Sequence, residues 1–372
     1  MKIIIASDSF KGSMTSVEVA QAATEGIREV YPDCQVHAVN VADGGEGTVE
    51  AIVDALGGEI VVAKVSDPLG REITARYGIA GDTAIIEMAA ASGLPLLQPD
   101  ERNPWVTSTR GTGEMIMDAI ARGCRRFLVG IGGSATNDAG TGMLQAMGFR
   151  FYDAAGQLIS MGCGGRMQDI ARIDDVYVPD AVRQSVFTVA CDVDTPFCGP
   201  EGAAPVFAPQ KGADAEMVAR LDAGMASLAQ VIADKYHVDV VPIAGAGAAG
   251  GMGGAFYAFL HATLKPGIDM VLDAIGFDRI IQGADLVITG EGKVDFQTAK
   301  GKTAAGVLSR AKQQHIPVIA IGGCVELCDA VMQMGFAGIY PILVEKVPLE
   351  LAMQRDFAMS NVRKTVARVL RQ

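Results

Sequence analysis

The sequence predicts an α/β protein of two domains, in which a discontinuous domain with a parallel sheet carries a second, mixed α/β domain as an insertion. The chain has 372 residues, more than a single common domain contains. Apolar strands alternate with amphipathic helices at both ends, whereas the middle begins with strands joined by tight turns. We expect the discontinuous domain to comprise residues 1–58 and 266–372 and the insertion residues 59–265, with the active site in the cleft between the domains.

The amino-terminal segment contains two strand–helix units. Residues 2–6 form an apolar strand, and Thr15 or Ser16 caps a helix whose apolar side chains recur at helical spacing. Residues 36–41 form the next strand, and residues 49–56 begin the second helix. The turn between them, Asp43–Glu46, is rich in glycine and acidic side chains. Each turn therefore follows the carboxyl end of a strand.

The inserted domain starts with strands at residues 60–65, 73–79 and 84–88, separated by turn sequences typical of hairpins. After these strands we expect a helix following Gly113, a strand at 127–129, a helix at 141–149, a strand at 186–191, a helix at 217–236, a glycine turn at 245–254 and a helix at 256–264.

The plain strand–helix rhythm returns past residue 266. Strands at residues 286–289, 318–321 and 339–343 enclose helices at 303–313 and 327–334, and an amphipathic helix spans 349–370. These elements complete the discontinuous domain.

Composition narrows the possible partners and compartment. The formal net charge of −12 argues against nucleic acid and anionic membranes as partners. Seven cysteines without a C-x-x-C motif, together with four scattered histidines, favour free buried thiols over a zinc site. We expect a cytoplasmic protein, since no signal-peptide segment precedes the first strand. Its oligomeric state, monomer or homodimer, stays open.

The stretch Arg126–Met143 combines a buried strand, a glycine-rich turn and a helix start. Gly132 and Gly133 let a ligand approach the backbone, and unpaired amides at a helix N-terminus attract anions. We therefore consider this turn, with Ser134 and Asn137, an anion site. The alternative is a tight strand–helix connection that binds nothing.

Two nucleotide motifs fail a strict test. Gly301-Lys302-Thr303 resembles the end of a P-loop, but the earlier glycine that a P-loop requires is Phe296 here. Gly245–Gly250 matches the dinucleotide fingerprint, yet Pro242 interrupts the strand that should precede it. A nicotinamide-dependent dehydrogenase is therefore a disfavoured alternative.

Several turns combine carboxylates with Ser, Thr, Asn or Lys, which are the side chains that enzymes of phosphoryl transfer use. Amides and lysines hold phosphates, carboxylates hold Mg²⁺, and one further carboxylate accepts the proton of the attacking hydroxyl. The turns are Asp8–Lys11, Asp43–Glu46, Ser134–Asp138, Asp192–Thr195 and Gly290–Thr298. Asp43 and Asp138 could equally be turn or N-cap residues, and Lys11 and Lys293 could be solvated surface.

The position of each carboxylate suggests a role. Asp192 ends an apolar strand, so we expect it to be the general base, with Asp295 as the second choice. Asp295 and Asp43 are the Mg²⁺ candidates.

Nine motifs taken together resemble the bacterial type 1 glycerate kinases, in the same order and over nearly the whole chain. They are Ser9–Lys11, Val41–Thr48, Glu87–Leu94, Thr109–Glu114, Gly130–Asp138, Ala190–Val193, Pro209–Ala213, Gly245–Gly254 and Ile288–Gly292. Phe296 departs from the family pattern, beside Asp295, and could bear on substrate fit.

The resemblance implies ATP-dependent phosphorylation of D-glycerate, at the 2-hydroxyl in close relatives, by a flavodoxin-like domain and a second α/β domain around a cleft. We expect ATP at Gly132, Gly133, Ser134, Asn137, Lys211, Gly290, Glu291 and Lys293, with Lys11 catalytic. The glycerate that the resemblance implies is a small carboxylate and calls for a cationic side chain, offered by Arg110, Arg71 and Lys11; Arg110 and Lys11 are preferred because both are expected in glycine-bearing loops. Ser9 is a further expected substrate contact. A non-catalytic sensor of a sugar acid or nucleotide stays open as the alternative.

Overall fold

The computed structural model describes residues 1–45, 47–345 and 347–372, so that Glu46 of the predicted acidic turn lies outside the described residues. The chain divides into two units. Unit 1 comprises residues 1–43, 54–56 and 268–372, and unit 2 comprises residues 44–53 and 57–267. Unit 1 is thus discontinuous in sequence, and most of helix α2 (Thr48–Leu56) belongs to unit 2.

Unit 1 is built on a five-stranded parallel sheet in the order β13-β12-β11-β1-β2. Its strands are β1 (Lys2–Ser7), β2 (Gln35–Asn40), β11 (Leu286–Val294), β12 (Val318–Val325) and β13 (Gly338–Pro341). Counted along unit 1, this order is 2-1-3-4-5 read from the β2 edge, the flavodoxin-like arrangement. The predicted flavodoxin-like α/β domain is confirmed, and the strand order reverses between β1 and β11.

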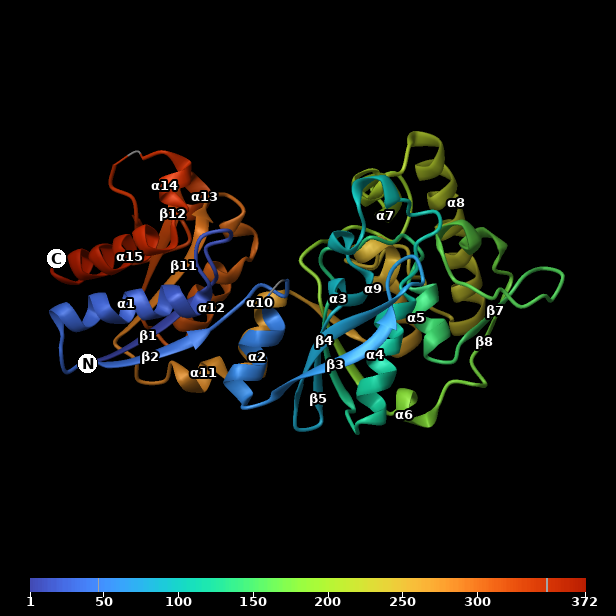
Figure 1. Cartoon of the computed structure of the whole chain (residues 1–372), viewed down its shortest axis with the longest axis horizontal. Helices are drawn as coiled ribbons and strands as arrows, with labels where there is room; N and C mark the ends of the chain where they lie inside the picture. Colours follow the sequence, from blue (N-terminus) through green and yellow to red (C-terminus); the bar gives the residue numbers. More distant parts are fainter. Residues whose placement is uncertain (46, 346) are drawn as a thin grey trace. The chain divides into compact units, whose positions relative to one another are not determined.

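Helices cover both faces of this sheet. They are α1 (Ser16–Val30), α10 (Gly267–Ile275), α11 (Phe277–Ile280), α12 (Thr303–Gln313), α13 (Asp329–Met332), α14 (Leu349–Ala352) and α15 (Arg355–Leu370). Helices α1 and α15 lie side by side (Figure 1) and share a core with Ile3 and Ile5 of β1. Alternate residues of a strand point to opposite faces, so α12, which contacts β1, β11 and β12 outside that core, covers the other face.

Unit 2 contains a six-stranded mixed sheet in the order β10-β9-β6-β5-β4-β3. Its strands are β3 (Glu59–Ser66), β4 (Glu72–Ala80), β5 (Thr83–Glu87), β6 (Arg126–Gly130), β9 (Val186–Ala190) and β10 (Thr263–Lys265); β7 (Arg150–Tyr152) pairs separately with β8 (Arg172–Asp174). β3, β4 and β5 pair antiparallel, as the hairpin turns predict, and the remaining pairs of the large sheet are parallel. The mixed second domain is therefore confirmed.

The helices of unit 2 surround this sheet (Figure 1). They are α3 (Ala89–Ser92), α4 (Arg110–Ala121), α5 (Thr141–Ala146), α6 (Asp180–Arg183), α7 (Ala203–Phe207), α8 (Ala215–Tyr236) and α9 (Ala248–Leu260), with short 3₁₀ turns such as Pro209–Lys211. Phe127 of β6 stacks on Phe187 of β9 with ring centroids 4.7 Å apart, and Phe187 also meets Phe256 of α9. The core of unit 2 is thus continuous from sheet to helix.

Several predicted element boundaries are wrong. Some are shifts of a few residues, such as the end of α5 at Ala146 instead of residue 149, and three change an element more substantially. Strand β11 continues to Val294, because Glu291, Lys293 and Val294 pair with β12 instead of turning away. The segment Thr263–Lys265 is a strand and not the end of a helix, since it pairs with β9. The last helix is interrupted between Ala352 and Arg355.

Helix α4 begins at Arg110, so Arg110–Gly113 is helical and not a glycine-bearing loop. The glycines are needed for close packing. A Cβ on Gly111 would lie 1.9 Å from the carbonyl oxygen of Ser66, and one on Gly113 would lie 2.3 Å from that of Met143. The glycines of this first turn of α4 therefore pack against protein backbone, although the sequence suggested that they make room for a ligand.

Within the described residues no helix is both long and apolar enough to cross a membrane. All seven cysteines are free, as predicted, although only Cys124, Cys163 and Cys198 are fully buried.

We expect Gly113→Ala to lower the free energy of unfolding of unit 2 by about 1–3 kcal/mol, the usual cost of overpacking. Alanine ordinarily stabilises a helix interior relative to glycine, so the sign of the effect reports the packing constraint. Gly224→Ala in α8 is the matched control, because its nearest neighbour would be 3.3 Å away. Urea unfolding measures both, and a Gly113→Ala variant more stable than the wild type would contradict the packing role.

Candidate functional site

The carboxyl edge of the unit 1 sheet gathers polar side chains at the point where the strand order reverses. The amide of Asp8, just after β1, donates to the carbonyl of Gly290 in β11 at 2.9 Å, so the end of β1 is tied to the middle of β11. Open α/β sheets bind ligands at such a switch point. Of the residues predicted to act, this edge brings together Ser9, Lys11, Asp43, Gly290, Glu291, Lys293 and Asp295.

Buried carboxylates dominate this edge. Asp8, Glu291 and Asp295 are each less than a tenth exposed. Burial raises the pKa of Glu291 to about 7, with smaller upward contributions from Asp8 and Asp295 and opposing ones from Thr298 and Lys302. Burial also raises the pKa of Asp8, and Asp43 adds to the effect. Glu291 therefore changes protonation state near neutral pH.

Hydroxyl groups hold these carboxylates in place. Thr303, the first residue of α12, donates from Oγ1 to Asp8 Oδ2 at 3.0 Å, and Thr298 donates to Glu291 Oε1. The backbone amide of Asp295 in turn donates to Thr298 Oγ1 at 3.0 Å. Thr303 thus ties the start of α12 to the end of β1, and Thr298 ties the turn after β11 back onto that strand.

Lys293 is a strand residue, which corrects the prediction that it lies in a tight turn after the strand. Its Nζ lies 3.3 Å from Asp295 Oδ2 and 2.9 Å from Glu326 Oε2. Burial alone would raise the pKa of Asp295, but the amide of Gln297 and the ammonium of Lys293 outweigh it and lower that pKa. Asp295 is therefore ionised at neutral pH, while Lys293 remains about half exposed.

Gly290 has a packing role in the sheet. A Cβ there would lie 2.8 Å from the Ile321 carbonyl and 2.9 Å from Ser7 Oγ. The residue is buried, so its glycine is required by neighbouring strands.

In unit 2, the turn after β6 divides into an exposed part and a buried part. Gly132 and Gly133 are exposed, and a Cβ on Gly132 would meet nothing within 4 Å. Ser134, Thr136 and Asn137 are buried. A ligand can therefore approach the backbone at the two glycines, as the sequence predicts, but not at Asn137.

Lys211 reaches this turn from the 3₁₀ turn Pro209–Lys211. Its Nζ donates to Ser134 Oγ at 2.7 Å and to the carbonyl of Thr136 at 2.6 Å. The side chain is only 1% exposed, and burial lowers its pKa to about 7 against the opposing charge of Asp138. The structure thus brings Ser134 and Lys211 together, as two of the residues expected around ATP.

The N-terminus of α5 is occupied by the protein's own anion. Asp138, fully buried, accepts hydrogen bonds from the amides of Gly140 and Gly142 and from both the amide and the hydroxyl of Thr109. We expected a ligand at this helix terminus, but Asp138 occupies it. The contacts therefore favour the alternative that Asp138 is a turn or N-cap residue.

Asp192 lies two residues past the end of β9, at the carboxyl edge of the unit 2 sheet. It is exposed, so the sequence argument from the cost of burying an idle aspartate does not apply. Its Oδ1 accepts a hydrogen bond from the amide of Gly267 at 2.9 Å. The carboxylate is held in a defined position and is open to solvent.

The two candidate arginines are exposed and paired with acidic residues. Arg71 contacts both Asp67, at 2.5 Å, and Glu101, at 2.6 Å. Arg110 contacts Glu114 at 2.8 Å, one helical turn further along α4. Among the described residues, Arg110 therefore has one carboxylate partner to exchange for a substrate, whereas Arg71 has two.

The dinucleotide-like glycines contact protein backbone. A Cβ on Gly247 would lie 2.1 Å from the carbonyl of Pro196, and one on Gly250 would lie 2.2 Å from that of Thr136. Ala249, Gly250 and Gly251 have positive φ and kink α9. No strand precedes the motif, so the fingerprint arises from packing, and the dehydrogenase alternative loses its support.

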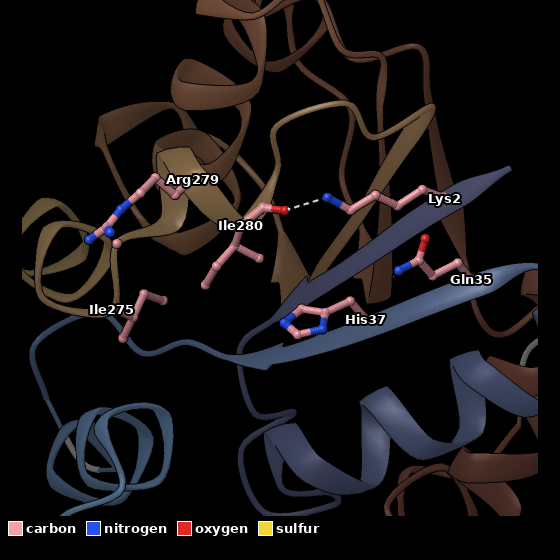
Figure 2. Close-up of a pocket in the computed structure, with 7 residues that line it drawn as sticks. Lys2, Gln35, His37, Ile275, Arg279 and Ile280 are labelled. Carbon is pink, nitrogen blue, oxygen red and sulfur yellow. Dashed lines mark hydrogen bonds between the residues drawn. The ribbon is translucent and has the colours of Figure 1, made fainter.

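A surface pocket of about 370 Å³ lies at the opposite edge of unit 1. Figure 2 shows Lys2, Gln35 and His37, from the amino ends of β1 and β2, facing Ile275, Arg279 and Ile280, with Lys2 donating to the Ile280 carbonyl at 2.8 Å. Ligands of open α/β sheets bind at the carboxyl ends of strands, so this pocket is separate from the candidate site.

Sequence reasoning assigned no role to four residues that organise the site: Asp8, Thr298, Thr303 and Thr109. Asp8 was included in a carboxylate-bearing turn, and its position directly after β1 could have singled it out. The threonines give no such signal, since their partners are up to 295 positions away.

Comparison with known proteins places the whole chain in one family. The family model described as the glycerate kinase family matches residues 3–372. A glycerate kinase of Bacillus subtilis is 48% identical, over 95% of this chain and 93% of its own. A glycerate 2-kinase of Escherichia coli is 45% identical, over 99% and 98%.

A solved structure agrees. The crystal structure of a putative glycerate kinase 2 from Salmonella typhimurium matches with a TM-score of 0.90 and 45% identity, covering 99% of this chain and 97% of that one. The chain therefore belongs to the glycerate kinase family.

Proposed function

We propose that the chain transfers the terminal phosphoryl group of ATP to the 2-hydroxyl of D-glycerate. The observation that carries the proposal is the similarity, over nearly full length, to glycerate kinases and to a glycerate 2-kinase at 44–48% identity. The polar edge of unit 1 and the open glycine turn of unit 2 supply the cationic and amide donors that phosphoryl transfer needs. The substrates of this activity, ATP and D-glycerate, are both small anions.

The edge of unit 1 is the proposed site of phosphate and metal contacts. Lys11 and Lys293 supply positive charge, and Ser9 supplies a hydroxyl. The oxygen-only donor set fits Mg²⁺, which usually takes one or two protein carboxylates and completes its shell with phosphates and water. Asp295 and Asp43 would hold the ion, and no group of three or more possible ligands is found among the described residues. When bound, Mg²⁺ would neutralise phosphate charge.

Unit 2 is proposed to supply the base and a carboxylate-binding side chain. Asp192 is exposed and held by Gly267, so it can accept the proton of a substrate hydroxyl without first being uncovered. Arg110 is preferred over Arg71 for the glycerate carboxylate, because its guanidinium is paired with one acidic side chain. The exposed Gly132 and Gly133 would receive an anionic group.

The assay for the proposed function is product formation. Purified protein with Mg-ATP should release ADP only when D-glycerate is also present. In the ³¹P spectrum a 2-phosphate couples to one carbinol proton and gives a doublet, whereas a 3-phosphate couples to two and gives a triplet. Binding of both substrates without ADP release would instead favour a sensor.

Asp192→Asn should lower kcat by about 10²–10⁴-fold while ATP affinity changes little, because a general base acts on the chemical step. Asp194→Asn is the matched control, since Asp194 is also exposed and stands two residues further along. Steady-state kinetics of both variants give the comparison. A loss of less than about tenfold in Asp192→Asn would move the base to Asp295.

Asp295→Asn should raise the Mg²⁺ concentration needed for half-maximal activity or abolish turnover, with an unchanged circular dichroism spectrum. Asparagine can still accept the hydrogen bond from the Gln297 amide, so the local fold is preserved. Glu326→Gln removes the other carboxylate on Lys293 and is the control. Full activity of Asp295→Asn at limiting Mg²⁺ would exclude Asp295 as a ligand.

A further inference from the structure

The contact between Lys211 and Ser134 brings together a titratable amine and a hydroxyl beside an open turn. Lys211 Nζ lies 2.7 Å from Ser134 Oγ, and Ser134 is 9% exposed, whereas Lys211 is 1% exposed. Gly132 and Gly133, which precede Ser134, are exposed. A ligand on the turn can therefore meet Ser134 but cannot meet Lys211.

The buried part of the turn contains polar side-chain atoms without hydrogen-bond partners among the described residues. Thr136 Oγ1 and Asn137 Oδ1 are buried and have no hydrogen-bond partner among the described residues. Such groups are rare in folded proteins and call for an explanation. Lys211 holds the same segment through the carbonyl of Thr136 at 2.6 Å, so its contacts limit how this segment can be arranged.

Few charges act on Lys211. Asp138, on the same turn, is the carboxylate that favours its ammonium form, and burial disfavours that form. The Cys163 thiol lies beside Asp138 and has a pKa raised chiefly by burial. Arg102 approaches through its backbone, whose carbonyl would lie 2.1 Å from a Cβ on Gly212. Lys211 has no ion pair among the described residues, so its charge depends on pH near neutrality.

A serine hydroxyl has one hydrogen, and the charge of Lys211 decides where that hydrogen can go. An ammonium group has only donors, so Ser134 Oγ must accept from it and keeps its own hydrogen for another acceptor. A neutral amine has a lone pair that can take the Ser134 hydrogen instead. The charged form thus makes Ser134 a donor toward the open turn, and the neutral form withdraws that donor.

We propose that Lys211 is a positioning residue that acts through Ser134, directing its hydroxyl hydrogen to an anionic oxygen of a substrate bound on the Gly132–Gly133 turn. The inference rests on the proposed function, which supplies two such anions, the phosphates of ATP and the carboxylate of glycerate. Anion affinity at this turn is then lost as pH rises through the pKa of Lys211. Lys211 itself does not touch the substrate.

Calorimetric titration with a non-hydrolysable ATP analogue and, separately, with D-glycerate tests the proposal. The ratio of dissociation constants between Ser134→Ala and the wild type is measured from about pH 6 to about pH 8, on either side of the pKa near 7. Titration of the ligand cancels in this ratio. For one of the two ligands we expect a ratio of about tenfold at low pH, which corresponds to the loss of a hydrogen bond to a charged group. The ratio should fall toward one at high pH. The ligand that shows it identifies the anion.

Two further variants separate positioning from folding. Lys211→Met should lose the pH dependence, because its side chain has neither an ammonium group nor an amine lone pair, and Ser134→Thr, which keeps the hydroxyl, should retain it. Lys64→Met, on the exposed surface of β3, is the control and should match the wild type. If Lys211→Met does not fold, the comparison of Ser134→Ala with Ser134→Thr is sufficient to test the proposal.

A pH-independent Ser134→Ala ratio for both ligands would overturn the inference, as would a Lys211→Met variant that keeps the wild-type pH dependence. The proposed function fails separately, by the absence of ADP. Release of ADP with a flat ratio refutes only the role of Lys211, and a pH-dependent ratio without ADP refutes only the kinase activity.

Discussion

The buried carboxylate of Asp138 is the constraint on which the architecture of unit 2 depends. It joins the first turns of α4 and α5 by accepting from Thr109 and from the amides of Gly140 and Gly142. Burial raises its pKa, and these donors work in the opposite direction by stabilising the charged form. Removing the carboxylate would leave buried amides unpaired, at about 1–3 kcal/mol each. The turn after β6 is therefore fixed by an internal anion, which leaves only its exposed end to a ligand.

Most glycines of the motif-rich segments are explained by the same close packing. A Cβ on Gly142 would lie 2.1 Å from Ser108 Oγ, and Gly250 and Gly253 approach backbone carbonyls at 2.2 Å. Gly132 differs, because it is exposed and a Cβ there would meet nothing within 4 Å. Glycines in the motifs of this chain thus mostly mark close contacts with protein atoms, and an exposed one such as Gly132 is where a ligand can approach instead.

The order of strands and helices could be predicted from the sequence because it depends on local periodicity, and α12 was placed at its observed bounds, Thr303–Gln313. What could not be predicted depends on partners distant in sequence. Strand β11 continues past Thr289 because β12 offers it further hydrogen bonds. The positions of Lys211 and Ser134 in the sequence do not predict the 2.7 Å contact between their side chains. The exposure of Asp192 depends on the loop around it and not on the apolar strand before it, so the sequence did not predict it either.

The electrostatics of unit 1 set a condition on any phosphate that binds there. Asp8 and Asp295 both raise the pKa of Glu291, and Asp43 raises that of Asp8. A polyphosphate brought to this edge adds negative charge where carboxylates are buried and poorly screened. Lys11 and Lys293 oppose that charge from exposed positions, where water and salt weaken their effect. A divalent cation would reduce this repulsion, so the acidity of the edge favours the Mg²⁺ proposed to bind there.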